Sequence, residues 1–240
     1  MDNNPSIHRR KVTVGLLTTF LILAFAHTNL FAQQVAKVTS TTNSIGYWEY
    51  LPPGYNSNTD KYPIVFFMHG IGERGDGTTQ IGKVTANGPP KFAKNGYQFP
   101  FILISPQLKS SYGTWPAWYI DEVVEYCKTY LRIDESRIYI TGLSLGGGGA
   151  WVYAQAYASK IAALAPVCGG YNSPSQACNI VNSQVPTWAF HGDADPTVNI
   201  NKTTNMINAM LACNPAPNPA PIYTIYPGVK HNAWDYAYRT

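Results

Sequence analysis

A serine with the spacing G-x-S-x-G lies past the middle of the chain, in residues 142–146. This pattern is typical of a serine on a tight strand-to-helix turn, where the hydroxyl can attack a carbonyl carbon. An apolar run precedes it at 138–141, and the sequence after it predicts a helix over 148–159. The alternative is an ordinary glycine-rich turn with a solvated serine. The flanking elements favour the first interpretation, so we predict that Ser144 is a nucleophile.

A nucleophilic serine needs a base, because a free hydroxyl hardly ionises at neutral pH. The chain contains five histidines: His8, His27, His69, His191 and His231. For a serine on such a turn, the usual order along the chain is serine, acid, histidine. His231 follows both Ser144 and the best candidate acid, and it lies just after the last predicted strand. We predict that His231 is the general base, with a surface loop histidine as the alternative.

The acid is expected after the predicted strand 186–190, in a segment that reads His-Gly-Asp-Ala-Asp-Pro-Thr-Val. Two aspartates compete there. Asp195 is favoured because the proline and valine that follow it fit a tight acid turn, whereas Asp193 is typical of a residue that caps the turn. We therefore expect Asp195 to orient His231 and to stabilise its cation. Asp193 is the alternative.

Negative charge on a reacting carbonyl oxygen would be stabilised by backbone N–H donors. We expect one donor from Leu145, directly after the serine, and one from Ile71, in the loop after the predicted strand 62–68. Glu73 and Arg74 lie in the same loop, and we expect an ion pair between them to order it. Two strands end in histidines that we expect to form structural hydrogen bonds: His69 and His191.

The elements that must position these residues alternate between strands and helices. Apolar runs predict an edge strand at 46–51 and further strands at 62–68, 101–106, 137–141, 161–167, 186–190 and 222–226. Helical spacing of apolar residues predicts helices at 116–131, 148–159 and 202–211, and the glycine-rich residues 72–88 are expected to be a loop. This alternation predicts an α/β fold with a mostly parallel sheet and helices on both faces. Sites in such sheets form at the carboxyl ends of the strands.

Composition bounds the possible functions. Of the 240 residues, 45% are hydrophobic and 12% are charged, and the formal net charge is +4. So few charges argue against a disordered chain and against a nucleic-acid partner. No cysteine or histidine pair has the spacing of a zinc site, so we expect no metal and no cofactor.

The first residues have the order of a secretory signal peptide. A basic cluster at 9–11 precedes an apolar run at 12–26, and small residues lead to Ala32. The apolar run is shorter than the roughly 20 residues that span a bilayer, so cleavage after Ala32 is favoured over a membrane anchor. We expect a signal peptide at 1–32, a linker at 33–44, a catalytic domain at 45–240, and a secreted or periplasmic protein without stable membrane insertion.

Four cysteines lie in the expected domain: Cys127, Cys168, Cys178 and Cys213. In an exported protein an even number suggests disulfides, and four cysteines allow three pairings. Cys127 lies on the apolar face of a predicted helix and is expected to be a buried thiol. Cys168 with Cys178 would close a short loop, and Cys178 with Cys213 is the alternative.

Four segments carry a family resemblance: residues 69–76 (HGIGERGD), 142–147 (GLSLGG), 165–170 (APVCGG) and 191–195 (HGDAD). Together they resemble the polyhydroxybutyrate depolymerase-like and feruloyl/acetylxylan esterase group of α/β-hydrolases, which is related to the catalytic domain of prolyl oligopeptidases. The resemblance covers about residues 45–238. It implies a carboxylic ester hydrolase that acts on polysaccharide-linked acetyl or feruloyl esters or on polyesters, so an ester substrate is the expected partner. Family members usually continue into a further helix, so the domain is expected to be truncated or to lack that helix.

Other functions are compatible with the same residues. A serine peptidase or a lipid or thioester hydrolase would use the same three side chains, and a non-catalytic carbohydrate-binding protein could keep the fold alone. An aromatic cluster before the first long helix contains Trp115 and Trp118. We hypothesise that these rings stack on a sugar or a feruloyl ring, and core packing is the alternative.

Overall fold

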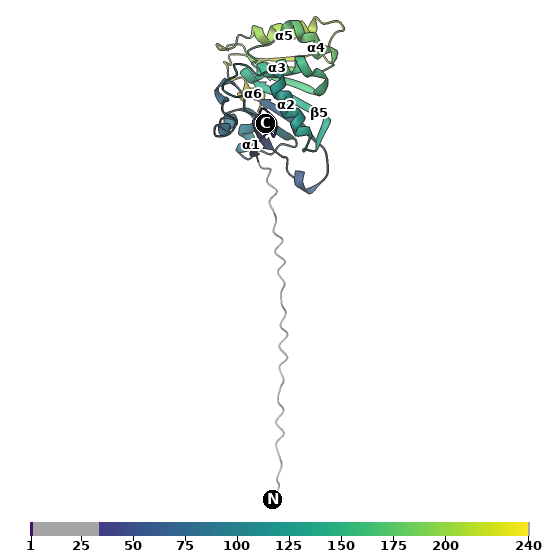
Figure 1. The fold of residues 1–240 in the computed structure, drawn as a ribbon. Coiled ribbons are helices and arrows are strands. Elements are labelled where there is room, and N and C mark those ends of the chain that lie inside the picture. The colour runs from purple at the N-terminus through teal and green to yellow at the C-terminus, as the bar shows by residue number, and fades with distance from the viewer. Residues whose placement is uncertain (2–33, 240) are drawn as a thin grey trace.

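The computed structural model describes Met1 and residues 34–239, which fold around one eight-stranded sheet (Figure 1). The strand order is β1-β2-β4-β3-β5-β6-β7-β8, and only the pairs β1–β2 and β2–β4 are antiparallel. The strands are β1 (Gln34–Val38), β2 (Gly46–Tyr50), β3 (Tyr62–Met68), β4 (Ile102–Pro106), β5 (Ile133–Leu143), β6 (Ala163–Val167), β7 (Trp188–Gly192) and β8 (Ile222–Tyr226). The predicted α/β fold with a mostly parallel sheet is confirmed.

Helices cover the two faces of the sheet unequally. They are α1 (Gly88–Lys94), α2 (Ala117–Lys128), α3 (Leu145–Tyr157), α4 (Ala177–Asn182), α5 (Asn201–Leu211) and α6 (Trp234–Ala237). Residues of α2, α3, α4 and α5 join the larger buried cluster, and residues near α1 and α6 join the smaller one. Because side chains alternate along a strand, neighbouring residues of β3 enter different clusters: Phe66 lies in the larger and Phe67 in the smaller.

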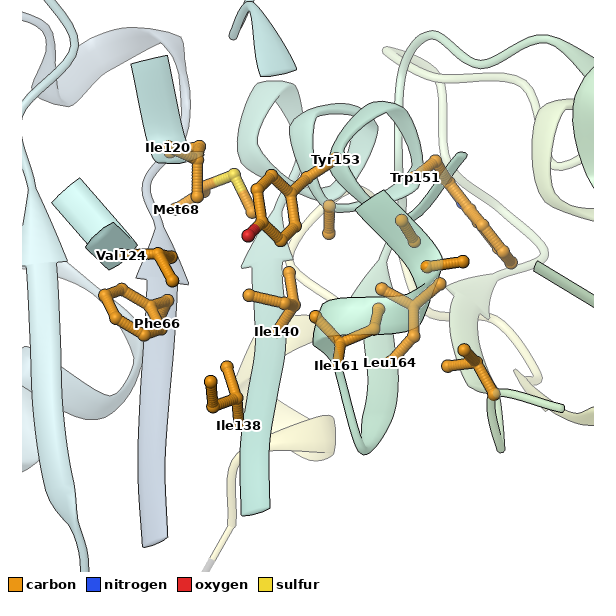
Figure 2. Packing of buried hydrophobic residues seen from close by; sticks show 14 of the residues in the cluster. Phe66, Met68, Ile120, Val124, Ile138, Ile140, Trp151, Tyr153, Ile161 and Leu164 are labelled. Atoms are coloured by element: carbon orange, nitrogen blue, oxygen red, sulfur yellow. The ribbon is translucent and has the colours of Figure 1, made fainter. Parts of the chain in front are cut away.

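The larger cluster fixes the orientation of α3, the helix that follows the candidate nucleophile. Figure 2 shows Phe66 of β3 and Ile140 of β5 in one packed layer with Val124 of α2 and Tyr153 of α3, all of them buried. Full burial of each such side chain contributes roughly 1.5–3 kcal/mol. The start of α3 is therefore held rigidly at the end of β5.

The opposite face is only partly covered over β5 to β8. An apolar groove of about 600 Å³ runs along it, lined by sheet residues such as Ala165 and Phe190 and by Tyr238. None of the candidate catalytic residues lines this groove.

Several elements differ from the expectations. The expected linker 33–44 is wrong in part, because β1 forms within it and pairs with β2 in register from Gln34 to Val38. The expected loop 72–88 contains short 3-10 turns and leads into α1, and α4 was not predicted. The short-loop cysteine pairing does not form: the disulfide joins Cys178 to Cys213, and Cys127 and Cys168 are buried free thiols.

The expected signal peptide 1–32 lies outside the described residues, apart from Met1. Among the helices of the described residues, none has the length and apolar character needed to span a bilayer.

Candidate active site

Ser144 occupies the turn between β5 and α3. Its backbone has φ 54° and ψ −117°, a strained conformation that is uncommon for a residue with a side chain. The flanking glycines are required by space: a Cβ at Gly142 would lie 2.4 Å from the Gly146 carbonyl oxygen, and one at Gly146 would lie 2.0 Å from the Met68 carbonyl oxygen. The predicted strand–turn–helix context is therefore present. It presents Ser144 at the carboxyl edge of the sheet.

His231 and Asp195 complete a line of hydrogen bonds from the serine. Ser144 Oγ lies 2.8 Å from His231 Nε2, and His231 Nδ1 lies 2.7 Å from Asp195 Oδ2. His231 comes from the loop after β8, and Asp195 from the loop after β7. The structure thus brings together residues that are far apart in the sequence: His231 lies 87 positions after Ser144 and 36 positions after Asp195. With this geometry, His231 Nδ1–H donates to the carboxylate and Nε2 accepts from the serine hydroxyl.

The Asp195 side chain is inaccessible to solvent but is well hydrogen-bonded. Its Oδ1 accepts from the backbone N–H groups of Thr197 (2.8 Å) and Val198 (2.9 Å). Burial alone would raise the pKa of this carboxyl, but the hydrogen bonds from His231 and from the two backbone N–H groups outweigh it and hold the pKa below its usual value. Asp195 is therefore charged at neutral pH and can stabilise a cationic His231.

Asp193, the competing acid, has a different place. Its Oδ1 accepts a hydrogen bond of 2.6 Å from the backbone N–H of Gly228, in the loop that carries His231. Its own backbone N–H donates to the Tyr226 carbonyl. Asp193 therefore ties the acid loop to the histidine loop, and its carboxylate is not the one that contacts His231.

Each of the two expected oxyanion donors is the first residue of a helical segment. Leu145 is the first residue of α3, and Ile71 is the first residue of a 3-10 turn (Ile71–Glu73). Within residues 34–239, neither backbone N–H donates to a protein acceptor. The lack of a protein acceptor is what the predicted role of these two N–H groups requires.

Hydrogen bonds of the His69 ring hold the loop that contains Ile71. Burial lowers the pKa of His69 to about 4, so the ring is neutral. Its Nδ1–H donates to the Gly70 carbonyl (2.6 Å), and its Nε2 accepts from the Leu108 N–H (3.0 Å). The prediction that His69 is a structural hydrogen-bonding residue is confirmed.

Arg74 holds the same loop, but not through the expected ion pair. Its guanidinium donates to the Ile71 carbonyl at 3.1 Å and to the Tyr112 carbonyl at 2.8 Å. Glu73 instead accepts a hydrogen bond from the Asn87 amide, and the described residues contain no Glu73–Arg74 ion pair. The expected ion pair is therefore wrong.

The two tryptophans differ in accessibility. Trp115 is buried, and its indole N–H donates to the His69 carbonyl at 3.1 Å, so it supports the loop instead of presenting a face for stacking. Trp118 is 41% exposed and lies edge-to-face with Tyr112 at 6.0 Å between ring centroids. Core packing is thus the correct interpretation for Trp115. A substrate contact at Trp118 stays a prediction.

Sequence reasoning missed two neighbours of the candidate base. Trp234 of α6 lies edge-to-face with the His231 ring at 5.2 Å. The Cys168 thiol donates to the His231 carbonyl at 3.4 Å. The position of Trp234 three residues after the histidine was an available signal, whereas nothing in the spacing of Cys168 indicated its contact.

Cys168, Asp195 and His231 also form the one group in the described residues whose ligand atoms lie close enough to hold a metal ion. Burial raises the pKa of the Cys168 thiol to about 12, so it stays protonated. Because the other two side chains already bond to each other, the arrangement fits a hydrogen-bonded triad better than a set of metal ligands.

The chain is similar to several known proteins. Residues 118–234, which include Ser144, Asp195 and His231, match the model of the dienelactone hydrolase family. A probable feruloyl esterase C of Aspergillus terreus is 26% identical over 216 residues, which cover 87% of this chain and 77% of that protein. Poly(3-hydroxyalkanoate) depolymerase C of Paucimonas lemoignei is 26% identical over 167 residues, covering 62% of this chain but 37% of that protein.

Solved structures extend the likeness to the whole described domain. The crystal structure of a thermostable esterase superposes with a TM-score of 0.69 and 26% identity. The match covers 88% of this chain and 61% of that one, so the chain spans less than two thirds of that structure. The chain therefore has the α/β-hydrolase fold and is a carboxylic ester hydrolase. It is similar to dienelactone hydrolases, feruloyl esterases and polyhydroxyalkanoate depolymerases.

Proposed function

We propose that this ester hydrolase works through a Ser144–His231–Asp195 triad and a covalent acyl-enzyme, and that it acts on esters linked to polysaccharides or on polyesters. The observation that carries the proposal is the line of two hydrogen bonds, 2.8 Å and 2.7 Å long, that joins the three side chains at the carboxyl edge of the sheet.

The reaction follows from the positions of the donors. His231 Nε2 takes the Ser144 proton as the serine oxygen bonds to the ester carbonyl carbon. The carbonyl oxygen becomes an anion and accepts hydrogen bonds from the backbone N–H groups of Leu145 and Ile71; one such donor is typically worth about 3 kcal/mol of barrier. His231 then gives its proton to the leaving alcohol, and Asp195 stabilises its cation meanwhile. Water, activated by the same histidine, releases the acid and restores Ser144. The scheme uses no cofactor.

The substrate class is inferred from the relatives. Their names assign feruloyl esters and polyhydroxyalkanoates to proteins that this chain resembles. The exposed ring of Trp118 is available to contact an aromatic acyl group or a sugar beside the site. Short acetyl esters are expected to be accepted as well, because a small acyl group needs no dedicated pocket.

We also propose that the protein is exported after removal of residues 1–32. The Cys178–Cys213 disulfide supports this proposal, because structural disulfides form mainly in oxidising compartments. Detection of an N-terminus at Gln33 in the culture medium or periplasm would support export, and a protein that keeps residues 1–32 in the cytoplasm would contradict it.

The triad is tested by two acid variants and one serine variant on p-nitrophenyl acetate. Ser144→Ala is expected to abolish hydrolysis while the melting temperature stays that of a folded protein. Asp195→Asn is expected to lower kcat by about 10⁴-fold, because an amide favours the wrong histidine tautomer. Asp193→Asn is the matched control, since an amide oxygen can still accept the Gly228 N–H, and it is expected to change kcat only a few-fold.

The result that contradicts the triad is full activity in Ser144→Ala, or equal losses in the two aspartate variants. The substrate class is tested separately with wild-type protein on methyl ferulate, acetylated xylan and polyhydroxybutyrate. Hydrolysis of a peptide anilide with no activity on any of these esters would contradict the proposed substrates while leaving the triad intact.

A further inference from the structure

His191 ends β7 and lies behind the candidate acid, fully enclosed by protein. Its Nε2 is 3.0 Å from the Val198 carbonyl oxygen and 3.3 Å from Asp195 Oδ2. Its Nδ1 is 2.8 Å from the hydroxyl oxygen of Thr203, a buried residue in the first turn of α5. The ring thus connects a helix to the turn that holds Asp195, and it is separate from the His231 contact on the same carboxylate.

These neighbours determine where the proton of the ring resides. Nε2 faces two oxygens that can only accept, so it must carry hydrogen, because a lone pair there would face both oxygens. Nδ1 then accepts from the Thr203 hydroxyl. Burial lowers the pKa of His191, which keeps the ring neutral with this single tautomer. The contact with Asp195 is therefore that of a neutral N–H with a carboxylate.

The turn around Asp195 depends on this N–H. Val198 donates its backbone N–H to Asp195 Oδ1, and the Val198 carbonyl accepts from His191. A shift of Val198 would therefore rotate the carboxylate that His231 must meet at Oδ2. Without the ring, the Val198 carbonyl would also lose this hydrogen bond.

We propose that His191 and Thr203 are positioning residues of the triad: Thr203 fixes the His191 ring, and the ring holds Val198 and faces Asp195 so that the carboxylate meets His231. This inference rests on the proposed function, because it assigns the two residues to the orientation of the proposed catalytic acid. Neither residue contacts the reacting atoms.

The sharpest test uses Thr203, because two small changes separate its hydroxyl from its shape. Thr203→Val has nearly the same volume but no donor, whereas Thr203→Ser keeps the donor. On p-nitrophenyl acetate, Thr203→Val is expected to lower kcat about tenfold with little change in KM, since small misplacements of catalytic groups are costly. Thr203→Ser is expected to stay within about twofold of wild type, because its hydroxyl can still donate to Nδ1.

A second pair acts on the ring itself. His191→Leu removes the N–H and is expected to lower kcat up to about a hundredfold. His191→Gln can place an amide N–H near the position of Nε2 and is expected to recover much of this loss. If His191→Leu does not fold, the Thr203 pair still decides the question. The melting temperature of each variant shows that the protein measured is folded.

Proton NMR gives a readout that simple loss of packing does not move. The His231 N–H that donates to Asp195 should give a downfield resonance, and we expect it to shift in Thr203→Val but not in Thr203→Ser. Unchanged kcat and an unchanged resonance in folded Thr203→Val would overturn the inference, as would equal losses in the two Thr203 variants. Labelling of wild-type Ser144 by a fluorophosphonate separates the two proposals: no labelling means that the proposed function fails, and labelling with unaffected variants means that only this inference fails.

Discussion

Two loops flank Ser144, and each begins with a His-Gly pair at the end of a parallel strand. His69 and Gly70 directly follow β3, and His191 and Gly192 are the last two residues of β7. Both imidazoles are buried and have a lowered pKa because burial disfavours the charged ring. Both therefore serve as neutral hydrogen-bonding groups. The same dipeptide is used twice at one edge of the sheet, for two different tasks.

The difference lies in what each ring holds. His69 bonds only to backbone groups, the Gly70 carbonyl and the Leu108 N–H, and so fixes the backbone that presents the Ile71 N–H. His191 bonds to the Thr203 side chain and to the acid turn, and so fixes a carboxylate. A strand-end histidine can thus orient either a backbone donor or a side-chain acid. The hydrogen-bond partners of the ring, and not the His-Gly motif, determine which of the two groups it orients.

The glycines of the two pairs give the strongest test of the comparison. A Cβ at Gly192 would lie 2.1 Å from the Val229 carbonyl oxygen, which is backbone, whereas one at Gly70 would lie 3.0 Å from a Leu143 methyl group. We expect Gly192→Ala to destabilise the protein by about 3 kcal/mol or more, because the loop that carries His231 must move. Gly70→Ala should cost about 1 kcal/mol, because a side chain can adjust. Urea unfolding of both variants measures this difference.

Equal losses of stability in the two variants would show that the loops are equally packed. The two loops would then differ only in the hydrogen bonds of their histidines.

The pH dependence of stability is the next test, because a buried neutral histidine resists protonation. The pKa of His69 falls from 6.5 to about 4 on folding, so between these values the unfolded chain binds a proton that the folded chain does not. Stability is therefore expected to fall as the pH drops from about 6.5 to about 4, by up to about 3 kcal/mol from this residue. His191 acts in the same direction. Asp195 adds to this loss at lower pH, since a carboxyl with a depressed pKa stabilises the fold above about 4 and the gain is lost as the pH falls further.

His69→Asn removes the titrating group and should flatten this dependence, although the variant is less stable at pH 7. The free energy of unfolding measured at pH 7 and at pH 4.5 tests the expectation. An equally steep dependence in His69→Asn would assign the acid sensitivity to other groups.

Substitution of Arg74 is expected to have the smallest effect, and it tests only the loop after β3. Its guanidinium ties the Ile71 carbonyl to the Tyr112 carbonyl. We expect Arg74→Met to lower kcat about tenfold, less than the loss of an oxyanion donor itself, because the Ile71 N–H is displaced and not removed. Arg74→Lys should lie between Arg74→Met and wild type, since an ammonium can keep one of the two hydrogen bonds. Wild-type kcat in Arg74→Met would mean that His69 alone holds this loop.

Much of this arrangement could be predicted from the sequence because local rules govern it. Apolar runs gave β3, β4, β5, β6, β7 and β8, and β8 matched its predicted bounds of 222–226. The strand-to-helix turn at Ser144 could be predicted because only glycine fits at its flanking positions. The order serine, acid, histidine along the chain identified His231 among the five histidines. The choice of Asp195 over Asp193 followed from turn chemistry, and in the structure Asp195 is the one bonded to His231.

The remainder depends on contacts between distant residues, which local patterns do not contain. β1 is a short strand with polar residues, and pairing with β2 is what makes it a strand. The partners of Arg74 are carbonyl groups, which any residue supplies, so the charges of neighbouring residues wrongly suggested an ion pair with Glu73. The hydrogen bond between Thr203 and His191 was equally hidden, since a buried threonine in a helix has no distinctive pattern.

The Cys178–Cys213 disulfide has a consequence for proteolysis. The two cysteines lie 35 positions apart, and the segment between them includes β7, Asp195 and the exposed residues Thr197 and Asn199. A protease that cuts the acid loop once leaves two fragments that are still joined through sulfur. The nicked protein would migrate as one band on a non-reducing gel and as two after reduction, and the fragment with His231 would stay attached to the fragment with Ser144 and Asp195.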